Sequence, residues 1–180
     1  TMQAKRQDIL IDVFREMINK GLRSWRLVLA GASLVKESEN KLLQKLKKQA
    51  QGLPVDFRVN IPFKQLISLY SQAKIFWHAA GYGIDESKHP ERVEHFGMTT
   101  VEAVAAGCWP LVYNAGGQRE IFSDFKKKDL VFWLTKEELL KKTLNIIGFS
   151  KKGLLQSSEL LKLPPKFSVK SFTENVQKII

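Results

Sequence analysis

Apolar residues recur along the chain at two different spacings, which predict where helices and strands alternate. Residues 5–20 repeat them every three or four positions, the period of an amphipathic helix, and Gly21 follows as an end signal. Residues 25–30 are almost continuously apolar after Arg26, as in a strand that is covered on both faces of a parallel sheet. The chain is therefore expected to open with a helix followed by a buried strand.

The same criteria predict the remaining elements. Further helices are expected at residues 38–51, 63–73, 99–106, 136–147 and 167–180. Further strands are expected at residues 55–59, 75–79, 108–113 and 130–134. Because strands and helices alternate over short connections, the pattern predicts an α/β fold: a Rossmann-like, doubly wound parallel sheet with right-handed crossovers. The length suits a single domain over residues 1–180.

Two features interrupt this pattern. Residues 79–98 lack apolar periodicity, and long loops that follow the carboxyl end of a strand commonly bind ligands. In addition, only residues 1–4 precede the first predicted helix, where a doubly wound sheet would supply its central first strand. We therefore expect this sequence to be a fragment whose fold is completed by upstream residues or by a partner chain.

Basic residues outnumber acidic ones, 29 to 18, which gives a formal net charge of +11. Such a charge attracts nucleic acid, an anionic membrane surface or a phosphorylated small molecule. The sequence has no aromatic RNA-binding strand motif and no zinc spacing, which argues against nucleic acid as a partner. The lysine-rich segment at residues 41–48 has two interpretations: it contacts anionic lipid peripherally, or it packs its leucines and solvates its lysines.

Cysteine and histidine bear on compartment and metal binding. Cys108 is the single cysteine, so no internal disulfide is possible and a reducing, cytoplasmic location is expected. We expect neither a membrane-spanning helix nor a secretory signal. His78, His89 and His95 do not stand at metal-ligand spacing, so no metal site is expected. His78 ends a strand and either contacts a ligand or is a satisfied buried histidine.

The chemically informative stretch is EHFGMTTVEAVAAG, residues 94–107. Gly97 stands where the loop becomes a helix, and its missing Cβ lets the backbone approach a ligand. The first N–H groups of that helix, at residues 98–101, form an anion site suited to a diphosphate. Glu94 and Glu102 flank this site and can accept hydrogen bonds from the hydroxyls of a sugar and a ribose.

With the strand and the Gly116-Gly117 turn that follow, this E-x7-E stretch resembles the donor-binding signature of family 4 (group 1) retaining glycosyltransferases of GT-B fold. The resemblance covers nearly the whole chain and corresponds to the C-terminal half of that fold. It implies an enzyme of hexosyltransferase type that moves sugar from a nucleotide diphosphate sugar to an acceptor. It further implies no metal or other cofactor, and an upstream domain that binds the acceptor.

The resemblance also implies roles for single residues. Glu94 would contact the transferred sugar, and Lys5 matches a lysine that grips the diphosphate; these two are the candidate catalytic residues. Glu102 would bind the ribose hydroxyls. The other expected substrate-binding positions are Phe96, Gly97, Met98 and Thr99. An Arg that the family carries just before the lysine has no counterpart here.

Several alternatives stay open at this level. Thr99 and Glu102 also fit a capping box, Glu94 fits a solvated loop acid, and Lys5 fits an ordinary exposed lysine. The alternative function is a nucleotide-binding regulatory module without turnover. A dinucleotide-dependent oxidoreductase shares the sheet type, but the sequence has no G-x-G-x-x-G after a strand.

Overall fold

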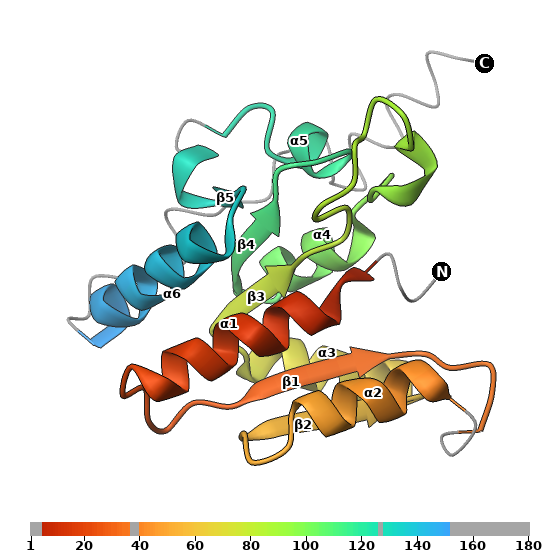
Figure 1. Cartoon of the computed structure of the whole chain (residues 1–180). Coiled ribbons are helices and arrows are strands. Elements are labelled where there is room, and N and C mark those ends of the chain that lie inside the picture. The colour runs from red at the N-terminus through yellow and green to blue at the C-terminus, as the bar shows by residue number, and fades with distance from the viewer. Residues whose placement is uncertain (1–4, 37–39, 126–127, 152–180) are drawn as a thin grey trace.

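The computed structural model describes residues 5–36, 40–125 and 128–151, and its elements follow the predicted order (Figure 1). The helices are α1 (Gln7–Asn19), α2 (Lys41–Gln49), α3 (Phe63–Gln72), α4 (Met98–Ala105), α5 (Gln118–Ile121) and α6 (Lys136–Lys151). The strands are β1 (Leu27–Gly31), β2 (Val55–Val59), β3 (Ile75–His78), β4 (Trp109–Tyr113) and β5 (Phe132–Trp133). Short 3-10 helices lie at Pro90–Arg92 and Lys128–Leu130.

One local prediction needs correction, and one short helix was not predicted. The strand expected at residues 130–134 is only two residues long, because Lys128–Leu130 form a 3-10 turn just before it. The turn at Gly116 and Gly117 leads directly into the short helix α5, which is four residues long and too short for periodicity to reveal. The helix expected at residues 167–180 lies outside the described residues.

Parallel strands with connecting helices confirm the α/β class, but the expected single sheet is divided in two. β1 pairs with β2, while β3, β4 and β5 form a separate sheet in that order. All of these pairs are parallel, with Leu27 opposite Val55 and Ile75 opposite Trp109 at their starts. In Figure 1, α2 lies in front of the β1–β2 pair, α1 runs above β1, and α3 lies behind β1.

The apolar face of α1 joins the two sheets into one core. Val13 and Met17 of α1 pack in a cluster with Leu111 of β4 and with the inner face of α6. Leu27 and Leu29 of β1, and Ile75 and Trp77 of β3, pack against the same cluster. Full burial of one such side chain stabilises the fold by about 1.5–3 kcal/mol. α1 is therefore the element on which both sheets depend.

The lysine-rich helix α2 packs its leucines inward, as one of the two interpretations proposed. Leu43 and Leu46 are buried, and Leu46 packs in a cluster with Ile11 of α1. Lys41, Lys45 and Lys48 are exposed. The helix begins at Asn40, whose side chain accepts a hydrogen bond from Leu43 N. In the described part of the chain, no helix has both the length and the apolar character that crossing a bilayer requires.

Candidate functional site

The carboxylate of Glu94 is the centre of a polar cluster at the carboxyl end of β3. Lys5 Nζ lies 2.5 Å from Oε2, His78 Nε2 lies 3.2 Å from the same oxygen, and Gly97 N donates to Oε1 at 3.2 Å. The Glu94 side chain is only 14% exposed, so the interpretation as a solvated loop acid is wrong. Lys5 is 52% exposed but holds an ion pair, so it is not simply a free surface lysine.

These contacts keep Glu94 ionised. The hydrogen bond from His78, followed by the hydrogen bond and charge of Lys5, holds the pKa of the Glu94 carboxyl well below its usual range, although burial opposes this. A carboxylate that is charged throughout the neutral range accepts hydrogen bonds and does not serve as a general acid. Its chemistry is therefore suited to binding hydroxyl groups or a positive centre.

His78 and Gln118 belong to this cluster, although the sequence assigned neither of them to it. His78 is 7% exposed and Gln118 is fully buried. Gln118 Nε2 lies 3.5 Å from His78 Nδ1. When the Gln118 amide donates to Nδ1, the ring proton of His78 is on Nε2, from which it is donated to Glu94. The one signal in the sequence was that His78 ends a strand. Gln118 had no signal, because it reaches the site from the helix after the glycine turn.

Gly97 starts α4 in a conformation that suits glycine. Its φ of 65° is left-handed, and a Cβ there would lie 2.5 Å from Ile121 Cδ1. No side chain caps this helix start and Thr99 lies inside the helix, so the capping-box interpretation is wrong. Thr100 N and Val101 N both donate to Gly97 O, which leaves the N–H groups of Met98 and Thr99 at the open end of the helix.

The Gly116-Gly117 turn clamps the backbone of the loop that carries Glu94. Gly117 N donates to Glu94 O at 2.7 Å, and Gly116 N donates to Glu86 Oε1 at 3.0 Å. A Cβ on Gly117 would lie 1.9 Å from His95 O, and one on Gly116 would lie 2.2 Å from Glu94 O. The two parts of the motif are thus in direct backbone contact, which no larger residue would permit.

The other expected binding residues lie around this cluster. Glu102 is partly buried on α4 and accepts a hydrogen bond from Tyr70 OH at 3.4 Å. Burial, then the nearby Glu102, raises the pKa of Tyr70 to about 12, so Tyr70 stays a hydrogen-bond donor. Phe96 and Met98 are 79% and 68% exposed, so their side chains lie largely in solvent.

The remaining histidines and the cysteine are occupied elsewhere. His95 Nε2 lies 3.1 Å from Pro90 O, and His89 pairs with Glu91. Cys108 is buried, and burial raises the pKa of its thiol to about 11, so it stays protonated. Across residues 5–36, 40–125 and 128–151, no three His, Cys, Asp or Glu side chains converge as metal ligands would.

Comparison with known families gives this geometry a context. The family model described as "Glycosyl transferases group 1" matches residues 2–147. The chain belongs to this family. A Xenopus laevis protein named GDP-Man:Man(3)GlcNAc(2)-PP-Dol alpha-1,2-mannosyltransferase is 35% identical to this chain over 96 residues, which cover 52% of this chain and 17% of that protein.

A Homo sapiens glycosyltransferase of the same name is 32% identical over 123 residues, which cover 64% of this chain and 23% of the relative. The chain thus spans less than a quarter of the length of these two relatives. A solved structure, the catalytic domain of cholesterol-alpha-glucosyltransferase from Helicobacter pylori, superposes with a TM-score of 0.63 and 18% identity over 87% of both chains. That likeness confirms the GT-B-type fold of this glycosyltransferase domain.

Proposed function

We propose that this chain is the donor-binding domain of a retaining glycosyltransferase, and that its donor is a nucleotide diphosphate sugar. The observation that carries the proposal is the ionised Glu94 beside Lys5, held against the open N-terminus of α4. GDP-mannose is the first candidate donor, because relatives from two organisms are named as GDP-Man-dependent mannosyltransferases.

Each part of the donor has a chemically matched group. The diphosphate faces the N–H groups of Met98 and Thr99 and the ammonium of Lys5, the sugar hydroxyls face Glu94, and the ribose faces Glu102. During transfer the bond between the anomeric carbon and the diphosphate breaks, and its electron pair passes to the phosphate oxygen. The acceptor hydroxyl oxygen forms the new bond to the anomeric carbon, and its proton passes to the departing diphosphate. The helix N-terminus and Lys5 stabilise the charge that grows on the leaving diphosphate.

Titration calorimetry on this chain with GDP-mannose, GDP and UDP-glucose tests the proposal. We expect GDP-mannose to bind in the presence of EDTA, because a helix N-terminus and a lysine stand where a metal would otherwise neutralise the diphosphate. Loss of binding on chelation would contradict metal independence. Absence of binding by every nucleotide would contradict the donor site itself.

Two substitutions separate the roles of the acidic residues. Glu94→Ala is expected to weaken GDP-mannose far more than GDP, whereas Glu102→Ala is expected to weaken both through the ribose. Glu91→Ala is the matched control, since Glu91 lies in the same loop with its side chain 64% exposed and is expected to leave both affinities unchanged. Equal losses for both ligands in both variants would overturn the assignment.

The alternative is a regulatory module that binds the nucleotide without turnover. An assay of GDP release by a longer form of the protein, with an acceptor-binding part, distinguishes this module from the proposed glycosyltransferase. Release of GDP from GDP-mannose, with or without added lipid-linked acceptor, supports the enzyme. Binding with no release under either condition favours the module. A cytoplasmic location and peripheral contact of the exposed α2 lysines with anionic lipid remain further parts of this proposal.

A further inference from the structure

Arg6 stands between Lys5 and α1, and its guanidinium group has bound partners on several sides. Nη1 donates to Tyr82 O at 2.5 Å, while Nε and Nη2 donate to the two carboxylate oxygens of Asp8 at 3.1 Å each. The guanidinium carbon also lies 5.4 Å from the centroid of the Tyr82 ring, in a cation–π contact. Only 27% of the Arg6 side chain is exposed. These contacts fix the Arg6 side chain in place.

The backbone of Arg6 sets the direction in which the chain enters α1. Its φ of 50° and ψ of 43° are left-handed, a conformation that residues other than Gly, Asn and Asp seldom adopt. Arg6 O accepts a hydrogen bond from Ile9 N at 3.1 Å, so the first turn of the helix starts at this residue. Left-handed backbone at a larger residue persists where the surrounding contacts hold it. The position of Lys5, one residue earlier, therefore depends on the contacts of Arg6.

Tyr82 is a firm anchor for these contacts. Its ring packs edge-on against Tyr113 of β4, with centroids 5.4 Å apart, and in a tilted arrangement against the buried Trp133 of β5, at 5.6 Å. Its backbone N donates to Ala79 O at 3.1 Å. Arg6 thus fastens the start of α1 to the sheet formed by β3, β4 and β5.

The two members of the Lys5–Glu94 ion pair have separate supports. The loop that carries Glu94 is clamped by Gly117 N, which donates to Glu94 O, and this clamp does not involve Arg6. Lys5 is 52% exposed and reaches Glu94 from the residue next to Arg6. Removal of the Arg6 guanidinium is therefore expected to release Lys5 while the Glu94 loop stays in place.

We propose that Arg6 is a positioning residue: through Tyr82 and Asp8 it keeps Lys5 against Glu94, where Lys5 faces the diphosphate of the donor. The effect on the diphosphate rests on the proposed function, whereas the placement of Lys5 rests on the contacts alone. Loss of Arg6 then has the same consequence as loss of Lys5. A role limited to starting α1 would instead be met by any residue that adopts the left-handed conformation.

Residue-resolved acetylation of lysine side chains, without ligand, tests the placement of Lys5. An amine that donates to a carboxylate is a poorer nucleophile, so Lys5 is expected to react about two- to fivefold more slowly in the wild-type chain than in Glu94→Gln. Arg6→Asn removes the guanidinium but keeps a residue that tolerates the left-handed conformation. It is expected to raise the reactivity of Lys5 to the level in Glu94→Gln. The exposed Lys45 of α2 is the internal reference and is expected to react equally in all chains.

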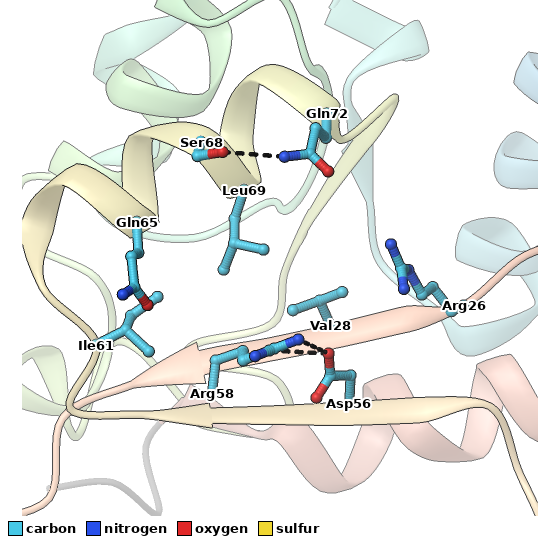
Figure 2. A pocket seen from close by; sticks show the side chains of 9 residues that line it. All are labelled: Arg26, Val28, Asp56, Arg58, Ile61, Gln65, Ser68, Leu69 and Gln72. Carbon is cyan, nitrogen blue, oxygen red and sulfur yellow. Dashed lines mark hydrogen bonds and ion pairs between the residues drawn. The ribbon is translucent and has the colours of Figure 1, made fainter.

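Arg58→Asn is the matched control. Arg58 Nε donates to Asp56 at 2.8 Å, which is an arginine–aspartate pair with the same two-residue separation as Arg6 and Asp8. Figure 2 shows this pair beside a hollow of about 230 Å³ between α3 and the β1–β2 pair, and the hollow shares no residue with the Glu94 cluster. Arg58→Asn is expected to leave both the acetylation of Lys5 and the affinity for GDP unchanged.

Titration calorimetry with GDP tests the effect on the diphosphate. Arg6→Asn and Lys5→Met are each expected to weaken GDP binding about tenfold, and the double variant no further, because both changes remove the same ammonium group from the diphosphate. Where Arg6→Asn fails to fold, Arg6→Lys replaces it, since an ammonium cannot reproduce the bonds of the guanidinium fork.

The outcomes separate this proposal from the proposed function. Additive losses in the double variant would show that Arg6 acts independently of Lys5, and would overturn the proposal. Acetylation of Lys5 that is as slow in Arg6→Asn as in the wild-type chain would overturn it as well. Failure of the wild-type chain to bind GDP would contradict the donor site, while faster acetylation of Lys5 in Arg6→Asn would still establish that Arg6 places Lys5.

Discussion

The charge of Glu94 depends on side chains that are far from it in the sequence. Lys5 stands 89 residues earlier and Gln118 comes from the following glycine turn, yet both belong to the same cluster through Glu94 and His78. The hydrogen bonds from His78 and Lys5 favour the carboxylate of Glu94 over the carboxylic acid. At this scale the site works as a fixed negative charge beside a positive helix end.

This arrangement predicts a specific acid sensitivity. The folded pKa of Glu94 lies below its ordinary value of 4.5, so its contribution to stability is complete above pH 4.5 and is lost as the pH falls toward the folded pKa. Below pH 4.5, the free energy of unfolding is expected to fall more steeply for the wild-type chain than for Glu94→Gln. Urea unfolding across this pH range measures the difference, with Glu91→Gln as control. Parallel pH profiles for all three chains would contradict the prediction.

Gly117 predicts an effect of steric origin. A Cβ there would lie 1.9 Å from His95 O, so Gly117→Ala must push the Glu94 loop away from the turn. We expect a loss of about 3 kcal/mol or more in the free energy of unfolding. Gly148→Ala is the control, because it has open space in α6 and is expected to stabilise by about 0.5–1 kcal/mol. Equal effects of the two substitutions in urea unfolding would be inconsistent with the clamp.

At the scale of elements, α2 shows how a local sequence signal becomes structure. Asn40 caps the helix through Leu43 N at 2.9 Å, and the leucines that follow face α1. Asn40→Ala is expected to lower the free energy of unfolding by about 1 kcal/mol, because a helix-terminal N–H loses its acceptor. Lys45→Ala, on the exposed face of the same helix, is expected to change it by less than about 0.5 kcal/mol. A smaller effect of Asn40→Ala than of Lys45→Ala would refute the cap.

For the whole molecule, α1 is the structural link between two sheets that share no strand pairing in the described residues. Ile11 is fully buried between α1, α2 and the β1–β2 pair, and Ile11→Ala is expected to cost about 2–5 kcal/mol. Because the lost contacts hold α2 and the β1–β2 pair against α1, we expect β2 to lose hydrogen-exchange protection before β4 does. Ile67→Ala, at a half-exposed position on α3, is the control and is expected to cost far less. Simultaneous loss of hydrogen-exchange protection in β2 and β4 would contradict this prediction.

Much of the candidate site could be predicted because its signals are local. A glycine before a helix, two glutamates eight residues apart and a glycine pair after a strand are all constraints on neighbouring backbone, and the sequence displays them directly. The partners of Glu94 could not be found in this way. His78 and Gln118 converge only because β3 ends and α5 begins at the same edge of the fold, and a contact across 40 residues leaves no periodic trace.

The sequence by itself determined the order of helices and strands, their parallel α/β class and the loop that bears the chemistry, because hydrophobic period and turn residues act over a few positions. Only the tertiary structure decided that β1 and β3 do not pair, that α2 leucines face α1, and that Glu94 is partly buried and charged. These properties depend on which distant segments pack together. Strand pairing and desolvation are long-range effects that a linear pattern does not contain.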